Sequence, residues 1–158
     1  MKSLFYLIST MVLLVAGCTT DKTGIFDLYS QPKKSITLID YVTDPRYRDP
    51  VNITEVRVHG DRLELTVQFS GGCKEHRFFL YGWRGLSNSK PVQADLFLSH
   101  NANNDYCEAL LTANLQFDLT PLKELYWQTY SDNGPILLRI YAPGMNRIFY
   151  PLPAYLLQ

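Results

Sequence analysis

The sequence predicts an all-β protein, an antiparallel β-sandwich of immunoglobulin-like size with one short connecting helix. Three observations predict this class. Apolar and polar residues alternate with a period of two over several segments, turn-forming residues separate these segments, and one segment has helical spacing. The chain has 158 residues, 46% of them apolar, which is enough for the core of a single domain. A small β-barrel is the alternative arrangement of the same strands.

The first 17 residues have the pattern of a signal peptide. Lys2 supplies one positive charge, and residues 4–14 form an apolar run that is too short to cross a bilayer as a helix. Small residues then precede a cysteine in the sequence Leu14-Val15-Ala16-Gly17-Cys18. This sequence closely resembles the lipobox of bacterial lipoproteins.

The lipobox resemblance implies a lipid anchor. In that family the cysteine, here Cys18, receives a diacylglycerol, becomes the first residue after removal of residues 1–17, and is N-acylated, for example with palmitate. Two or more acyl chains anchor a protein stably in a membrane. Thr19 and Thr20 follow Cys18, without the aspartate that retains such lipoproteins in the inner membrane. The resemblance therefore implies a protein of the bacterial cell envelope, anchored in the outer membrane and facing the periplasm.

The residues after Cys18 have the composition of a tether. Residues 19–34 are mostly polar and show no apolar period. Such a segment reaches roughly 50 Å when extended, enough to hold a domain clear of the lipid headgroups. We therefore divide the chain into a signal peptide (residues 1–17), a lipidated cysteine with a flexible tether (18–34) and a single β domain (35–158).

The clearest element of the domain is a β-hairpin over residues 53–69. Its apolar residues alternate with polar ones, and Gly60-Asp61 supplies a two-residue turn between the strands. Closing this turn puts the apolar residues of both strands on one face. It also puts Arg57 opposite Glu64, which is a favourable cross-strand pair.

The remaining elements follow the same patterns. In residues 76–83 apolar side chains occupy both odd-numbered and even-numbered positions, and therefore both faces of a strand. This predicts a central strand that is covered on both sides. A helix is expected from Thr120, which can cap it, with Pro121 in its first turn and its end before Asn133. Further strands are expected at residues 36–42, 92–98, 109–117, 136–141 and 147–150.

Two cysteines and two histidines are expected to meet at one edge of a sheet. If the hairpin around residues 87–88 closes symmetrically, His76 lies close to His100 on the neighbouring strand. Cys73 lies just beyond that strand end, and the following turn returns Cys107 to the same end. The four side chains therefore form the candidate site.

Two interpretations of this cluster are open. In the first, Cys73 and Cys107 form a disulfide, because they are the two thiols that remain in an exported chain after lipidation. In the second, Cys73, His76, His100 and Cys107 bind a tetrahedral zinc ion. The Cys-x2-His spacing suits chelation, the six residues between His100 and Cys107 make a loose second half, and export disfavours free thiolates. We expect the disulfide and no cofactor, with zinc as the alternative.

The histidines also have interpretations that do not involve the cysteines. His76 and His100 allow a hydrolytic or metal site together with Asp105 or Glu75. The simpler interpretation is that they hydrogen-bond loop backbone and hold the turns. The chain has no G-x-S-x-G, P-loop or G-x-G-x-x-G sequence. The sequence therefore favours a protein that is not an enzyme.

A second resemblance covers about a third of the chain. Residues 71–78 (GGCKEHRF), 107–111 (CEALL) and 117–122 (FDLTPL) resemble a pattern in bacterial lipoproteins that have no established activity. It supports the envelope setting and adds no chemistry. The 15 Lys+Arg balance the 15 Asp+Glu, so net charge does not point to nucleic acid. We expect a membrane-anchored binding or structural domain, stapled by a disulfide, with an envelope protein or glycan as its partner.

Overall fold

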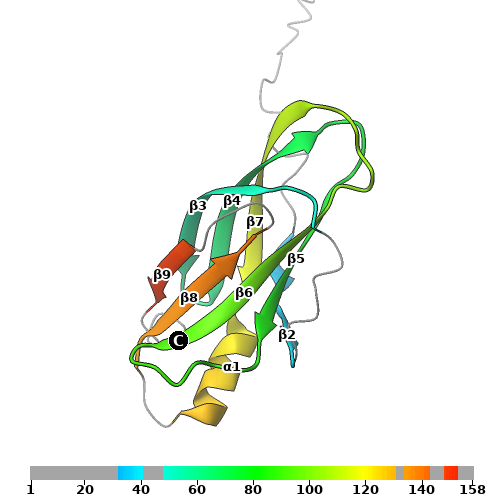
Figure 1. Cartoon of the computed structure of the whole chain (residues 1–158). Coiled ribbons are helices and arrows are strands. Elements are labelled where there is room, and N and C mark those ends of the chain that lie inside the picture. Colours follow the sequence, from blue (N-terminus) through cyan, green and yellow to red (C-terminus); the bar gives the residue numbers. More distant parts are fainter. Residues whose placement is uncertain (1–31, 41–47, 131–133, 143–147, 153–158) are drawn as a thin grey trace, which may run out of the picture.

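Two β-sheets pack face to face, and one short helix lies at the lower end of the sandwich in Figure 1. This computed structural model describes residues 32–40, 48–130, 134–142 and 148–152. The predicted signal peptide, Cys18 and the tether up to residue 31 lie outside the described residues.

The first sheet contains the strands β1 (Lys34–Ser35), β3 (Asn52–His59), β4 (Arg62–Gly71) and β7 (Ala109–Asp118). Their order across the sheet is β1-β7-β4-β3. β3 and β4 form the predicted hairpin, β4 pairs antiparallel with β7 along its whole length, and the short strand β1 runs parallel to β7.

The second sheet contains β2 (Thr37–Ile39), β5 (Arg77–Trp83), β6 (Val92–Asn101), β8 (Ile136–Tyr141) and β9 (Ile148–Leu152). Their order is β2-β5-β6-β8-β9. β5 and β6 form an antiparallel hairpin, as do β8 and β9, whereas β2 pairs with β5 and β6 pairs with β8 in parallel.

The predicted all-β sandwich is confirmed, and neither sheet closes into a barrel within the described residues. The strand pairing, however, is mixed rather than purely antiparallel. After β6 the chain crosses to the other sheet as β7 and returns through α1 (Thr120–Thr129) to β8. A parallel pair needs a long crossover of this kind, because its two strands start at the same edge.

The hairpin register is the predicted one, including Arg57 opposite Glu64, but the ion pairs of these two side chains are made within their own strands. Arg57 stands opposite Glu64. Its guanidinium nevertheless pairs with Glu55 of its own strand, at an N–O distance of 2.7 Å, while Glu64 pairs with Arg62 at 3.0 Å. Residues two apart on a strand share a face, so these long side chains reach their own strand neighbours.

The predicted helix is present, with a different cap. Leu119 is the N-cap residue and Thr120 the first helical residue, so the prediction of Thr120 as the cap is wrong. The Asp118 carboxylate accepts hydrogen bonds from the Thr120 backbone N–H at 3.2 Å and its hydroxyl at 2.7 Å. Leu122 and Tyr126 are buried and close the lower end of the core. Among the described residues, no helix combines the length and apolarity needed to cross a membrane.

The core fills the space between the two inner sheet faces. Its members alternate along the strands with residues of the outer faces. The largest fully buried side chains come from both sheets, from α1 and from the turn before it: Tyr126, Phe78, Phe117, Leu63, Leu65, Leu80, Leu96, Leu98, Leu115, Leu119, Leu122 and Ile136.

β5 differs from the expectation of a strand covered on both sides. Phe78 and Leu80 are buried in the core as expected. Phe79, Tyr81 and Trp83 lie on the outer face and are half-buried. In Figure 1 no helix or strand of the described part of the chain lies over that face. On this face Lys34 lies over the Phe79 ring, and the Trp83 indole N–H donates to the Asp40 carbonyl oxygen.

A matched pair of leucines tests this placement of the core. Leu98→Ala removes a side chain that is 1% exposed, and we expect it to lower the free energy of unfolding by about 2–5 kcal/mol. Leu110→Ala makes the same change at a residue that is 72% exposed, and we expect an effect within about 0.5 kcal/mol. Urea unfolding followed by circular dichroism measures both. Equal losses would contradict the assignment of Leu98 to the core.

Candidate functional site

The predicted cysteine and histidine cluster lies at the upper end of the sandwich in Figure 1, opposite α1. The end of β4, the start of β5 and the loop between β6 and β7 meet there. Cys73 and Cys107 form the expected disulfide, with a Cα–Cα distance of 5.9 Å and a sequence separation of 34. A loop of that length gains roughly 3–4 kcal/mol of stability in the chain-entropy model. The disulfide fastens the β6–β7 loop to the end of β4.

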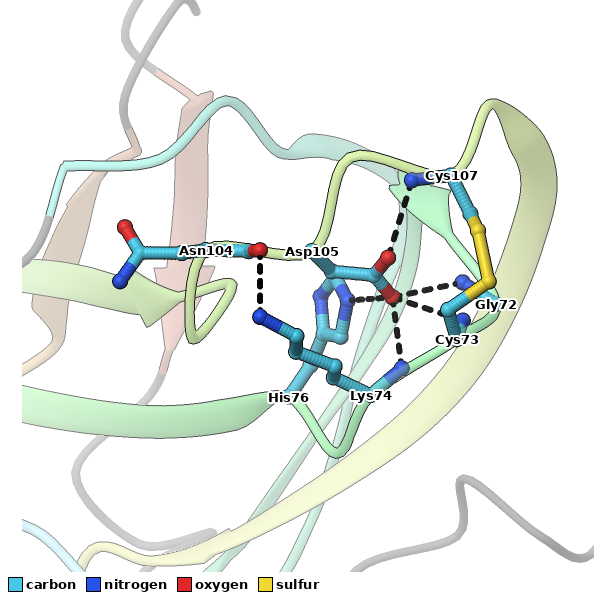
Figure 2. The surroundings of a disulfide bond; sticks show 7 residues. All are labelled: Gly72, Cys73, Lys74, His76, Asn104, Asp105 and Cys107. Atoms are coloured by element: carbon cyan, nitrogen blue, oxygen red, sulfur yellow. Dashed lines mark hydrogen bonds and ion pairs between the residues drawn. A yellow bond between two sulfur atoms is a disulfide. The ribbon is translucent and has the colours of Figure 1, made fainter.

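The Asp105 carboxylate lies at the centre of this end of the domain (Figure 2). Its Oδ2 atom accepts hydrogen bonds from the backbone N–H groups of Gly72, Cys73 and Lys74, each at 2.9 Å. Its Oδ1 atom accepts the N–H of Cys107, also at 2.9 Å. The carboxylate side chain is fully buried. One anion therefore joins the two chain segments that the disulfide also joins.

These donors keep the carboxylate ionised. The Cys107 N–H, followed by the N–H groups of Cys73 and Lys74 and the His76 ring, holds the pKa of Asp105 well below its usual range, although burial acts in the opposite direction. A protonated carboxyl group would have to give up part of this set, because its own O–H needs an acceptor.

Two glycines make this geometry possible. A Cβ atom on Gly71 would overlap the His76 ring, so no larger residue fits there without displacing the ring. Gly72 has a φ of 124°, a conformation that side chains disfavour. Together they let three consecutive N–H groups turn toward one oxygen, as in an anion-binding nest.

His76 and His100 continue the network into the domain. The His76 Nε2 atom lies 3.2 Å from Asp105 Oδ2, and His76 Nδ1 lies 2.8 Å from His100 Nε2. At the far end, His100 Nδ1 lies 3.0 Å from the Pro50 carbonyl oxygen and 3.2 Å from that of Asp49. A carboxylate and backbone carbonyls are acceptors, so the ring nitrogens that face them carry protons.

The hydrogen-bond partners thus assign three protons to four ring nitrogens. The third proton lies between the two rings, because a nitrogen–nitrogen contact of 2.8 Å needs one donor. Burial lowers the pKa of His100. The hydrogen-bonded chain therefore runs from the Asp105 carboxylate through the two imidazole rings to the backbone carbonyls of Asp49 and Pro50.

Aromatic rings enclose the two histidines. The Phe78 ring stacks on His100 with a centroid distance of 4.5 Å, and the Phe69 ring lies 4.7 Å from His76. Both histidines are 1% exposed. Their nitrogens are engaged with each other, with Asp105 and with backbone carbonyls. This arrangement holds loops together and leaves no ring nitrogen facing solvent to act as a base.

The two histidines have different partners in the structure. His76 contacts Asp105, the carboxylate named for a hydrolytic or metal site, while His100 hydrogen-bonds loop backbone. His76 lies close to His100, as expected, although the register pairs Phe78 with His100. The two rings still meet, because side chains two residues apart on a strand share a face.

A metal ion would need the reduced protein. One ligand atom from each of Cys73, Asp105 and Cys107 lies within 4.8 Å of the other two, and these residues form the donor group that the described residues offer. His76 and His100 do not belong to that group, although the predicted zinc set included them. In the disulfide the two sulfur atoms are bonded to each other, so neither is a thiolate ligand.

The network also fixes the shape of the β6–β7 loop. The Lys74 Nζ atom donates to the carbonyl oxygens of Asn103 at 3.3 Å and Asn104 at 2.8 Å. These asparagines have φ values of 55° and 54°, a left-handed conformation that asparagine tolerates. Tyr106 follows, between the buried carboxylate and the disulfide, and is 87% exposed. Leu110, at the start of β7, is 72% exposed.

Comparisons with known proteins define the fold alone. No protein-family model and no curated protein matches the sequence. A candidate lipoprotein from Bacteroides fragilis has a similar structure, with 8% identity and a TM-score of 0.53 over 78% of this chain and 72% of that one. A protein of unknown function from Bacteroides vulgatus has 17% identity and a TM-score of 0.51, over 77% of this chain and 56% of that one.

A NigD-like immunity protein from Bacteroides caccae has 18% identity and a TM-score of 0.48, over 77% of this chain and 61% of that one. The chain thus spans less than two thirds of the length of the B. vulgatus and B. caccae proteins. At these identities the likeness concerns the arrangement of the strands.

The ionised carboxylate predicts an acid-sensitive upper end. Because the pKa of Asp105 is lowered on folding, its contribution to stability is complete above its unfolded value of about 4 and is lost as the pH falls below that. In Asp105→Asn an amide NH2 group replaces one carboxylate oxygen, faces a backbone N–H and cannot accept its hydrogen bond. We expect a lower melting temperature at pH 7, on the order of 5–10 °C, and a flatter decline between pH 5 and pH 3 than in the wild type.

Thermal unfolding across this pH range measures both effects. Asp40→Asn is the matched control, since the Asp40 side chain is 74% exposed. We expect that variant to follow the wild-type curve. An acid decline in Asp105→Asn that runs parallel to the wild type would contradict the role given to this carboxylate.

Proposed function

We propose that this chain is a lipid-anchored, non-catalytic binding domain of the bacterial cell envelope. The lipobox sequence that ends at Cys18 supports the anchor, with the domain facing the periplasm from the outer membrane. The occurrence of the fold in a candidate lipoprotein from Bacteroides fragilis agrees with this setting. The polar residues 19–34 serve as the tether between the lipid and the domain.

The state of the Cys–His–Asp cluster supports a non-catalytic role. Its carboxylate and imidazole groups are buried and hydrogen-bonded to one another or to backbone, and its sulfur atoms form a disulfide. A general base or nucleophile needs contact with a substrate. The polar groups of the cluster instead bind one another and the backbone, and in this way they hold the loop in place.

The exposure of Tyr106 carries the proposal for binding. This side chain is 87% exposed, yet the residues on either side of it are fixed by the buried carboxylate and the disulfide. A rigid exposed tyrosine binds without the entropic cost of ordering a loop. Tyrosine is also among the residues that dominate protein interfaces. We therefore assign the partner contact to the β6–β7 loop.

Two other side chains of the upper end favour a protein partner over a glycan. Leu110, which stands opposite Ser70 at the end of β4, is 72% exposed and offers neither a planar ring nor a hydrogen bond to a sugar. The Lys74 Nζ atom lies 5.9 Å from the centre of the Tyr106 ring. An apolar pocket with a carboxylate at its rim would accept the tyrosine together with the lysine.

A second candidate function is zinc binding by the reduced protein. The close approach of Cys73, Asp105 and Cys107 favours it, because all three are zinc ligands when deprotonated. It includes a metal-dependent hydrolytic activity. This candidate and the disulfide exclude each other, since each uses both sulfur atoms.

Two substitutions in the full-length chain test the first proposal. We expect Cys18→Ser to leave the domain folded and to move it from the membrane fraction to the soluble fraction. Recovery of that variant firmly in the membrane fraction would contradict the anchor.

With a photoreactive benzoylphenylalanine in place of Tyr106, we expect a discrete cross-link to one envelope protein in intact cells. The same residue in place of Trp127, which is 45% exposed on α1, is the control. Equal labelling from both positions, or none from either, would contradict the loop as the binding surface.

A further inference from the structure

The pairing of β4 with β7 brings the two cysteines toward each other but ends before it reaches them. The last pair at the upper end is Gly71 opposite Ala109. Cys73 and Cys107 stand two residues beyond this pair, and the same antiparallel register, continued by two residues, would place them directly opposite each other. Their Cα atoms are 5.9 Å apart. The strands therefore bring the cysteines close, and contacts beyond the last pair hold them there.

The Asp105 carboxylate makes these contacts. The N–H groups that follow the last pair of β4 turn toward its Oδ2 atom. The Cys73 N–H donates to Oδ2 and the Cys107 N–H donates to Oδ1, each over 2.9 Å. Figure 2 shows the carboxylate between the two segments, beside the bonded sulfur atoms. One side chain thus holds the backbone of both cysteines.

These contacts do not use the sulfur atoms. The five groups at the carboxylate are four backbone N–H groups and the ring of His76, which is 1% exposed. The reduced chain contains the same five groups. The carboxylate and its donors can therefore assemble before the two thiols are oxidised, because this set of contacts does not require the S–S bond.

We propose that Asp105 is the positioning residue that aligns Cys73 and Cys107 for oxidation to the disulfide. In the first step one cysteine thiolate attacks an external disulfide, a mixed disulfide forms, and one external thiol leaves. In the second step the other cysteine thiolate attacks the protein sulfur of the mixed disulfide, and the second external thiol leaves. The two cysteines lose two electrons and two protons, which the two released thiols carry. The second step is intramolecular, so it depends on how the carboxylate aligns the cysteines.

The physical basis is the entropy of closing the loop. Cys73 and Cys107 are 34 residues apart, and bringing the ends of such a loop together costs conformational entropy. When the carboxylate network has already joined the two segments, formation of the S–S bond does not incur this cost a second time. The disulfide must in return strengthen the network by the same factor, because the coupling between two restraints is reciprocal.

Equilibration of the full-length protein with glutathione tests this role. The wild type and Asp105→Asn are held in detergent, without oxygen, in buffers of reduced and oxidised glutathione at pH 7. Acid quenching, alkylation and mass spectrometry of the peptides that contain Cys73 and Cys107 then give the oxidised fraction. We expect Asp105→Asn to lower the effective concentration of the two thiols about tenfold, which corresponds to about 30 mV in the reduction potential. An unchanged value would overturn the inference.

Two control variants separate alignment from a general loss of stability. The Asp49 Oδ2 atom accepts the Ala102 N–H at 2.6 Å, in the same loop but away from the cysteines, so Asp49→Asn removes a comparable contact. Leu98→Ala weakens the core. We expect both variants to keep the wild-type effective concentration, compared under conditions in which circular dichroism shows the reduced forms to be folded. A loss in these controls equal to that in Asp105→Asn would overturn the inference.

Amide hydrogen exchange of the wild-type protein tests the inference even if Asp105→Asn does not fold. Because the coupling is reciprocal, we expect reduction of the disulfide to speed the exchange of the Cys73 and Lys74 N–H groups about tenfold. The Leu65 N–H, in the middle of β4 between two paired strands, is the control and should keep its exchange rate. Equal rates at Cys73 and Lys74 in the two redox states would overturn the inference, as would an equal acceleration at Leu65.

Discussion

The buried carboxylate of Asp105 is the interaction on which the upper end of the domain depends. It accepts four backbone N–H groups and contacts the His76 ring, so five groups from two chain segments point at one anion. Burying a charge without such partners is prohibitively costly. The two glycines leave room for these donors, His76 links the carboxylate to His100, and the disulfide joins the same two segments.

The two ends of the sandwich differ in chemistry, and so do its two outer faces. The lower end is closed by apolar side chains of α1, whereas the upper end is closed by a polar network that holds an exposed tyrosine. One outer face is polar, and the other carries aromatic rings around a neutral ion pair. We propose the rigid loop that carries Tyr106 as a surface for contact with another molecule.

Much of this architecture could be predicted from the sequence. The hairpin register follows from alternation and a two-residue turn, and export with two remaining thiols predicts the disulfide. The parallel pairing of β6 with β8 could not be predicted, because it depends on which sheet each strand joins. The central role of Asp105 was also hidden. From sequence alone, an aspartate in an asparagine-rich loop is interpreted as a turn residue. The three N–H groups that bind it come from another loop, which only the folded chain brings close.

The central claim is that a disulfide and a buried carboxylate hold the upper end of the domain, without a metal ion. The most direct test is native and denaturing intact mass of the domain purified from an oxidising compartment, with thiol alkylation. The account predicts a mass about 2 Da below that of the reduced chain, no alkylation of Cys73 or Cys107, and no bound metal. Two alkylatable thiols after denaturation, together with the mass of zinc in the native spectrum, would contradict it and would make the upper end a metal site.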